Sequence, residues 1–374
     1  MKCVLGDIAN VTMGQSPKSE FYNFERQGMP FLQGNRTFGK RYPTFDTYTT
    51  KVTKIACAGD VIMSVRAPVG ELNFAPVDMC LGRGVCGIRM KNGNQDFLFY
   101  LLKYYMPRLL NKESGTVFGS VNRNDINGLE VEIPDDVGIQ RRIARALTML
   151  DEKIEENDRI NKNLEQQLHL IFERIFANVN PDVGLGEVVE TTSGGTPSRK
   201  HKDYYENASI CWVKSKELLG NYIHDTEEHI NDLALSKSSA KILPRHTVLI
   251  AMYGATVGAY GIISKPMACN QAICALLANE SYPYTYLFQM AYEQQQKLIN
   301  LAVGSAQQNI SQILIKQLLI HSNIDAIKRF HVLAQPLHQQ IEQLQLESRV
   351  LSETRDILLP KLLSGELDVS NINI

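Results

Sequence analysis

The sequence contains two copies of one pattern, separated by about half of its 374 residues. Leu5-Gly6-Asp7-Ile8 returns as Leu185-Gly186-Glu187-Val188, Gly14-Gln15-Ser16-Pro17 as Gly194-Gly195-Thr196-Pro197, and Val69-Gly70 as Val257-Gly258. Solenoid repeats are only about 20 to 50 residues long. A period this long therefore indicates that a whole domain was duplicated together with the segment that follows it.

Each copy ends in a long segment with a heptad pattern. The apolar stripe of the first runs through Ile143, Leu147, Leu150, Ile154, Asn157, Asn161, Leu164, Leu168, Ile171 and Ile175. That of the second runs through Phe330, Ala334, Leu337, Ile341, Leu344, Ser348, Leu351, Arg355, Leu358 and Leu362. Such a narrow stripe is typical of a coiled-coil seam, which requires a partner helix. The alternative, two amphipathic helices on separate cores, would show a wider apolar face.

The two segments are the nearest partners for each other, so we expect an antiparallel coiled coil. In the simplest register Ile143 lies opposite Leu362, Ile154 opposite Leu351, and Asn157 opposite Ser348. The last pair would form a polar layer that costs stability but fixes the alignment. Pro336 lies within the second stripe, so it predicts either a kink or the true start of that helix.

The fold class that we expect is α+β, with two tandem modules separated by the two long helices. The repeat predicts a first module over residues 1–138, a helix over 139–177, a second module over 178–325, and a helix and tail over 326–374. Short β-rich runs between Gly, Pro and Asn turns predict a twisted, mostly antiparallel sheet in each module. A helix near the end of each module is expected over residues 97–110 and 286–301.

Composition limits the classes of function. The formal net charge is -1, whereas a free-standing DNA-binding protein usually carries a basic excess, so any contact with DNA is local or shared with a partner. The seven cysteines include no CxxC pair, so we expect no metal site, and we expect no cofactor. The uncharged stretch 247–264 fits a strand, a tight turn and a strand better than a membrane span. The N-terminal residues lack the apolar core of a signal peptide, so a cytoplasmic location is expected.

Two motifs suggest catalysis and have simpler interpretations. Residues 82–87 match GxGxxG, but they lead into a strand pattern, so the glycines are expected to form a turn. Pro134-Asp135 followed by Asp151-Glu152-Lys153 is similar to the motif of metal-dependent nucleases. The latter three residues fall on a heptad helix, where we expect them to face solvent. We therefore expect no catalytic residues.

Several features together resemble a known family. They are the doubled module, the Gly-Gln-Ser-Pro and Gly-Gly-Thr-Pro turns, the segment 305–311, and the closing segment 358–367. This set resembles the specificity subunit of type I restriction-modification systems over nearly the whole chain. The resemblance implies that each module is a target recognition domain that reads one half of a split sequence in double-stranded DNA. It also implies that the helices set the gap and dock methyltransferase subunits, two of them in our expectation, in a complex with restriction and translocase subunits.

Candidate DNA contacts come from turns rich in Lys, Arg, Asn, Gln and Tyr, which supply phosphate anchors and hydrogen bonds to base edges. In the first module we select Lys18, Tyr22, Asn35, Arg36, Arg66, Asn122 and Arg123. In the second we select Lys200, Lys202, Tyr204, Lys214, Lys216, Tyr253, Gln307 and Asn309. Any one of them could instead be a solvated residue or a turn former. A coiled-coil adaptor whose modules bind proteins, and an enzyme with an unrecognised site, stay open as alternatives.

Overall fold

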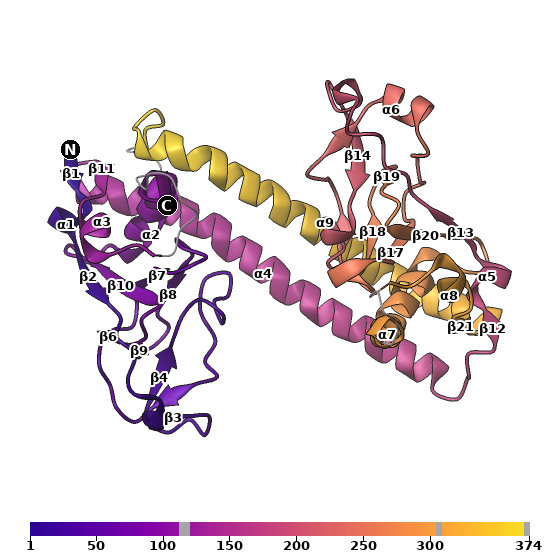
Figure 1. Ribbon diagram of the computed structural model, residues 1–374, viewed down its shortest axis with the longest axis horizontal. Helices are drawn as coiled ribbons and strands as arrows, with labels where there is room; N and C mark the ends of the chain where they lie inside the picture. The colour runs from indigo at the N-terminus through magenta and orange to yellow at the C-terminus, as the bar shows by residue number, and fades with distance from the viewer. Residues whose placement is uncertain (112–119, 304–308, 370–374) are drawn as a thin grey trace. The chain divides into compact units, whose positions relative to one another are not determined.

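The computed structural model describes residues 1–111, 120–303 and 309–369 (Figure 1). The contacts within the chain divide it into two compact units, one made of Met1–Ile154 with Val350–Ile374 and the other of Glu155–Arg349. Each unit contains one of the two sequence repeats and a part of each long helix. The duplication found in the sequence is therefore a duplication of structure.

The first module is built from short strands around one longer helix. Its elements are β1 (Lys2–Val4), α1 (Leu5–Ile8), β2 (Ala9–Met13), the 3-10 turn η1 (Ser19–Phe21), β3 (Tyr22–Asn23), β4 (Met29–Leu32), β5 (Tyr48–Thr49), β6 (Ile55–Ala56), β7 (Val61–Ser64), β8 (Leu72–Phe74), β9 (Met79–Leu81), β10 (Val85–Met90), α2 (Gln95–Asn111), α3 (Arg123–Asn127) and β11 (Glu130–Glu132). One sheet has the order β2-β10-β7-β8 and another the order β3-β5-β4-β9-β6, while β1 pairs with β11. Of these pairs only β4 with β9 is parallel, so the expected mostly antiparallel sheet is confirmed.

Helix α2 forms the core of this module together with the sheet. Phe97, Tyr100 and Leu101 recur at helical spacing on one face of α2 and are fully buried. They belong to one hydrophobic cluster with Val61 and Met63 of β7. The same cluster includes apolar seam residues from both long helices. The module therefore packs against the segments of the two long helices that belong to its own unit.

The second module repeats this plan. Its elements are β12 (Val183–Gly184), α5 (Leu185–Val188), β13 (Glu190–Ser193), η2 (Lys202–Tyr204), β14 (Ile210–Val213), η3 (Ser215–Glu217), β15 (Tyr222–Ile223), β16 (His229–Ile230), α6 (Asp232–Lys237), β17 (Val248–Ala251), η4 (Gly254–Thr256), β18 (Tyr260–Ile263), β19 (Ala268–Cys269), β20 (Ile273–Leu277), α7 (Tyr284–Val303), α8 (Gln312–Lys316) and β21 (Leu319–Ile320). Strand β20 lies between β13 and β17 as β10 lies between β2 and β7, and β14 pairs in parallel with β19 as β4 does with β9.

Equivalent cysteines occupy equivalent strands. Cys80 on β9 and Cys269 on β19 are buried, as are Cys86 on β10 and Cys274 on β20. All seven cysteines are free thiols.

The stretch 247–264 forms β17, a turn and β18, as predicted. Within the described ranges no helix has both the length and the apolar character that crossing a bilayer would require.

The glycines of the GxGxxG match form a tight turn, as expected. A Cβ atom on Gly82 would lie 2.7 Å from the Cα atom of Gln33, and one on Gly84 would lie 2.6 Å from the Gln33 carbonyl oxygen. Only glycine fits such a close approach between two backbones. The turn leads directly into β10, so the sequence motif serves sheet packing.

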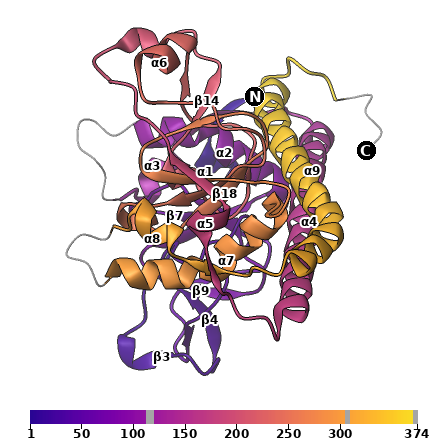
Figure 2. The ribbon, with the colours of Figure 1, turned by 90° about the vertical axis from the view of Figure 1, so that its right-hand side faces the viewer.

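The long helices are α4 (Val137–Phe176) and α9 (Ile324–Leu363), and Figures 1 and 2 show them side by side. In the unit Glu155–Arg349, the Nδ2 atom of Asn157 donates to Ser348 Oγ at 3.3 Å and to a Glu347 carboxylate oxygen at 2.7 Å. In the other unit, Arg355 pairs with Asp151 at 2.5 Å. The antiparallel coiled coil and the predicted contact of Asn157 with Ser348 are therefore confirmed.

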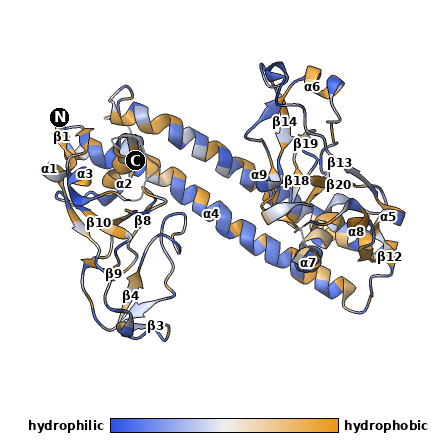
Figure 3. Ribbon diagram, in the orientation of Figure 1, coloured by the Kyte–Doolittle hydropathy of each residue, from blue (hydrophilic) through white to orange (hydrophobic). Residues whose placement is uncertain are grey.

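The seam follows the predicted stripe, and Figure 3 shows hydrophobic and hydrophilic residues interspersed along both helices. Less than one-tenth of the surface is exposed at Ile143, Leu147, Ile154, Asn157, Leu164, Leu168, Ile341 and Leu362. The seam residues Leu150, Leu344, Ser348, Leu351 and Leu358 are half-buried. The Oδ1 atoms of Asn157 and Asn161 are buried without a hydrogen-bond partner. This polar layer is a cost to stability, as expected.

One expectation about the helices is wrong, and one of the two alternatives for Pro336 is excluded. Asp151 does not face solvent: its side chain is 16% exposed because Arg355 occupies a seam position on α9 and reaches across to it. Tyr100 also donates a hydrogen bond to Asp151, at 2.6 Å. Pro336 does not mark the start of α9, which begins at Ile324, where the side chain of Asn323 accepts a hydrogen bond from the backbone of Ala326.

Candidate nucleic-acid interface

In the first module, the end of β7 lies beside the segment that enters α3. Arg66 forms an isolated antiparallel bridge with Ser120, and the backbone N–H of Val121 donates to the Val65 carbonyl at 3.0 Å. The Arg66 side chain is exposed, and no acidic group within the described residues pairs with it. This juxtaposition presents a guanidinium group at the surface.

The second module builds the same bridge with other side chains. Tyr253 follows β17 and bridges Asn309, while the Ile310 N–H donates to the Met252 carbonyl at 2.9 Å. The Tyr253 side chain is 43% exposed. Asn309 Oδ1 accepts a 3.4 Å hydrogen bond from the Gly254 N–H. The candidate Gln307 lies outside the described residues. Equivalent backbone positions thus carry Arg66 in one module and Tyr253 in the other.

Four further candidates lie in the loops that follow β4 and β14, the strands that pair in parallel with β9 and β19. Asn35 donates to a Glu71 carboxylate oxygen at 2.7 Å, and Arg36 pairs with Asp46 at 2.5 Å. Lys214 pairs with Glu228, and Lys216 pairs with Glu227 at 2.5 Å. Each of these candidates therefore has an acidic neighbour in its own module.

Hydrogen bonds within these pairs favour the charged forms of Asp46, Lys216 and Glu228. The hydrogen bond from Arg36 lowers the pKa of the Asp46 carboxyl, and the hydrogen bond to Glu227 raises the pKa of Lys216. Desolvation would raise the pKa of Glu228, but hydrogen bonds from Lys214 and Arg199 outweigh it, so that this pKa is lowered. The pairs of Arg36 with Asp46 and of Lys216 with Glu227 are exposed and therefore weak in water, so a phosphate can replace the acidic partner, whereas the Lys214 side chain is only 18% exposed.

Three candidate lysines follow the two Gly-x-x-Pro turns. Lys18, Lys200 and Lys202 are exposed, and no acidic side chain among the described residues pairs with them. A lysine in this setting is available to a phosphate group.

The tyrosines near these turns correct one sequence assignment. Tyr22 donates its hydroxyl to the Pro17 carbonyl at 2.8 Å, and Tyr205 donates to the Pro197 carbonyl at 2.7 Å. Tyr205 is thus the structural counterpart of Tyr22. The candidate Tyr204 is 8% exposed and packs in a small core with Trp212, so its ring presents little surface to a ligand.

Sequence reasoning missed Arg199, which directly precedes Lys200. Its guanidinium group lies over the Tyr205 ring at 4.5 Å and over the Trp212 ring at 5.4 Å, and it also pairs with Glu228. The available signal was a lone Trp within a basic and aromatic segment. Stacking of an arginine on aromatic rings holds its position, because the ring faces attract the cation.

Two candidates have local structural roles. Asn122 caps α3, since its side chain accepts hydrogen bonds from the backbone of Asn124 and Asp125. Arg123 donates to the Val11 carbonyl and thereby ties α3 to β2. These contacts explain why the two residues belong at these positions without any ligand.

The residues with the nuclease-like spacing, Asp135 and Asp151, do not come together in a metal centre. Asp135 pairs with the amino terminus at 3.1 Å, whereas Asp151 pairs with Arg355. Among the described residues, the only group of three potential metal ligands is Cys211, Asp225 and His229, in the second module.

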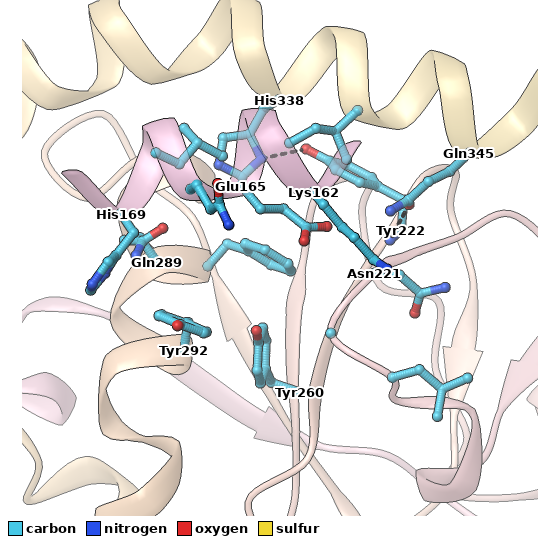
Figure 4. Close-up of a pocket in the computed structure, with 16 residues that line it drawn as sticks. Lys162, Glu165, His169, Asn221, Tyr222, Tyr260, Gln289, Tyr292, His338 and Gln345 are labelled. Atoms are coloured by element: carbon cyan, nitrogen blue, oxygen red, sulfur yellow. Dashed lines mark hydrogen bonds between the residues drawn. The ribbon is translucent and has the colours of Figure 1, made fainter. Parts of the chain in front are cut away.

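The unit Glu155–Arg349 also contains a cavity of about 420 Å³ (Figure 4). Its lining includes Tyr222, Tyr260 and His338, together with Lys162 and Glu165. His338 accepts from or donates to the Tyr222 hydroxyl at 2.9 Å, and desolvation lowers the pKa of His338 to about 3. None of the candidate DNA contacts lines this cavity, so it is a separate feature of the unit.

The comparisons with known proteins agree with the repeat. The sequence pattern of the type I restriction modification DNA specificity domain matches residues 1–166 and 181–322. A putative type I restriction enzyme MjaX specificity subunit from Methanocaldococcus jannaschii is 38% identical over 167 residues, which cover 43% of the chain and 39% of that protein. The MjaIX specificity subunit from the same organism is 24% identical over 98% of the chain and 93% of its own length.

A solved structure shares the fold. The type I restriction-modification S subunit from M. genitalium covers 99% of the chain and 96% of its own, with a TM-score of 0.64 and 16% identity. Type I specificity subunits are the DNA-recognition components of their systems and have no catalytic centre of their own. Because the family pattern covers both repeats and most of the residues, the chain belongs to the family of type I restriction-modification specificity subunits.

Proposed function

We propose that the chain reads a bipartite target in double-stranded DNA, with one module on each half, and that its coiled coil sets the spacer. It then directs two methyltransferase subunits, together with restriction and translocase subunits, to the site in the cytoplasm. The single observation that carries the proposal is the repeated bridge, Arg66 with Ser120 and Tyr253 with Asn309. The same scaffold presents different side chains, which is what two readers of unlike half-sequences require.

The charges of the candidate surfaces support binding through local contacts. Lys18 and Arg66 in one module, and Lys200 and Lys202 in the other, are exposed cations. Arg36 and Lys216 are exposed as well, with carboxylate partners that are 48% and 61% exposed. Such pairs are weak in water and are screened by salt. The chain can therefore bind phosphates despite its net charge of -1.

The helices suit the role of a spacer. A 40-residue helix spans about 60 Å at about 1.5 Å per residue, which exceeds the ~34 Å between successive turns of the duplex. The ion pair of Asp151 with Arg355 and the polar layer at Asn157 fix the register in which the helices pair. A fixed register gives a fixed length, and this is the property that a molecular spacer needs.

The proposal is tested by changing one reader at a time. Arg66→Ala and Tyr253→Ala should each relax the preference for bases in only one half of the target, and not in the same half. The variants are assembled with methyltransferase subunits, and the methylated sites are sequenced. Glu20→Ala, on an exposed turn of the first module, is the control and should leave the target unchanged. If either variant altered both halves, the assignment of one reader to each module would be wrong.

A salt titration separates this function from the adaptor alternative. If the modules neutralise phosphates, affinity for duplex DNA in the assembled complex should fall steeply with salt, and the slope should be reduced by about one for each phosphate-contacting lysine that is removed. Lys200→Ala and Lys202→Ala are the variants to compare. An adaptor that binds proteins would show no such slope with DNA.

A further inference from the structure

Three side chains of different chemistry converge beside the strand β14. Cys211 and His229 are direct partners in the antiparallel pairing of β14 with β16, so their side chains lie on the same face. Asp225 precedes His229 by four residues and lies in the loop that leads into β16. The pairing of β14 with β16 thus brings a thiol, an imidazole and a carboxylate together.

The distances describe a closed triangle. Cys211 Sγ lies 3.1 Å from Asp225 Oδ1 and 3.6 Å from His229 Nε2, and the latter two atoms lie 2.9 Å apart. Zinc with a thiolate at about 2.3 Å and nitrogen or oxygen at about 2.0 Å in tetrahedral geometry separates its ligand atoms by about 3.3 to 3.6 Å. The thiol and imidazole already have this separation. The carboxylate oxygen is about 0.4 Å too close to both, which a small rotation of the Asp225 side chain corrects.

We propose that Cys211, Asp225 and His229 form a Zn²⁺-binding site in the second module. The set of one sulfur, one nitrogen and one oxygen ligand suits this ion, and three protein ligands leave a fourth position for water. On binding, the Cys211 thiol loses its proton to solvent and its sulfur bonds to the metal, while a neutral His229 gives the lone pair of Nε2. No electrons are transferred, so no oxidant or reductant is needed.

The surroundings fit a metal site. Arg349 of α9 donates to the other carboxylate oxygen of Asp225 at 2.5 Å, which is the kind of outer contact that orients a ligand. The side chains of Asp225 and His229 are each 30% exposed, so an ion has a path of entry, while Cys211 is buried. Burial and the hydrogen bond with Asp225 raise the pKa of the Cys211 thiol, and the nearby Lys265 offsets only part of this, so the thiol binds a metal by losing its proton. Because Lys265 is exposed, it can turn to solvent when a cation binds.

The site has a mechanical consequence for the module. It would tie β14, the loop before β16 and, through Arg349, the helix α9 into one rigid group. The loop directly after β14 carries the candidate DNA contacts Lys214 and Lys216. Metal binding would therefore hold this loop in place. The metal site itself does not depend on the proposed DNA function.

The test uses the full chain, stripped with a chelator and titrated with Co²⁺ and Zn²⁺. One Co²⁺ per chain should bind and give the near-ultraviolet charge-transfer band of a cobalt–thiolate bond, and Zn²⁺ should abolish the band by displacement. Cys211→Ser should remove the band, and Asp225→Asn and His229→Gln should each weaken binding by at least about tenfold. Cys57→Ser and His201→Gln, which change exposed residues of the same types, are the controls and should bind as the parent does.

The competing description is a cluster of hydrogen bonds on Asp225 without a metal. It predicts that the stripped chain binds no Co²⁺ at micromolar concentration, or that the band survives Cys211→Ser, and either result overturns the proposal. Circular dichroism of each variant shows whether it is folded. If Cys211→Ser does not fold, the loss of affinity in His229→Gln, measured by Zn²⁺ competition on a folded protein, decides the question in the same way.

Discussion

The ion pair between Asp151 and Arg355 should stabilise the pairing of the long helices more than any exposed charge pair does. The two side chains are 16% and 14% exposed, and Asp151 also accepts a hydrogen bond from Tyr100. Breaking a fully buried pair from one side costs about 3 to 5 kcal/mol. The partial exposure here reduces the expected cost of Arg355→Met to about 2 to 3 kcal/mol. Methionine keeps the packing of the side-chain stem, so the loss reports mainly on charge.

A double-mutant cycle isolates the interaction. Asp151→Asn, Arg355→Met and the double variant are compared by urea unfolding, and the coupling energy should be about 1.5 to 2.5 kcal/mol. Both residues belong to the unit Met1–Ile154 with Val350–Ile374, so if the two units unfold separately, only the transition of that unit should move. The control cycle uses Arg145 and Glu152, whose side chains are 51% and 54% exposed, and should give about 0 to 0.5 kcal/mol. A coupling below that of the control would refute the reasoning.

Other substitutions test the polar layer and the cavity. Asn157→Leu removes a buried oxygen that has no partner, but it also removes the hydrogen bonds from Nδ2 to Ser348 and Glu347. Because these effects oppose each other, the free energy of unfolding, measured by urea titration, should change by less than about 1 kcal/mol, and a loss of more than about 2 kcal/mol would contradict this. Burial lowers the pKa of His338 from 6.5 to about 3 in the folded state. Below pH 6.5 the unfolded chain therefore gains a proton that the folded protein does not bind, so the free energy of unfolding decreases as the pH falls from 6.5 toward 3. His338→Gln should therefore reduce the loss of stability between pH 7 and pH 5 by up to about 2 kcal/mol, and an unchanged pH dependence would count against a neutral buried histidine.

Features that depend on local periodicity were predictable from the sequence. The heptad stripe predicted the extents of α4 and α9 within a few residues. It also placed Asn157 beside Ser348, because matching the ends of the two stripes selects one antiparallel register among those related by heptad shifts. The expected helices near the end of each module are α2 and α7. The duplicated turns led to the same family that the comparisons identify.

Features that depend on which partner a side chain finds were not predictable. The heptad position of Asp151 indicates solvent exposure, but a charged seam residue, Arg355, draws it toward the partner helix. The sequence around the second turn does not distinguish Tyr204 from Tyr205, since only the hydrogen bond to Pro197 identifies the counterpart of Tyr22. Cys211, Asp225 and His229 show no recognised metal spacing, and strand pairing alone brings them together.

The central claim, that two modules read two half-sequences across a spacer set by the helices, is tested most directly by lengthening the helices. One heptad is inserted between Ile154 and Glu155 of α4 and one between Arg349 and Val350 of α9. These junctions are where the two compact units meet along the chain, so the contacts within each unit are preserved. Each insertion adds about 10 Å at about 1.5 Å per residue, which is about three base pairs at ~3.4 Å each.

The measurement is sequencing of the methylated sites after the lengthened chain is assembled with its methyltransferase subunits. We predict that the gap grows by up to about three base pairs while both half-sequences stay the same, since a tilt of the helices against the DNA axis can only reduce the increase. An unchanged gap in a folded, active complex would contradict the account, because something other than α4 and α9 would then set the spacing.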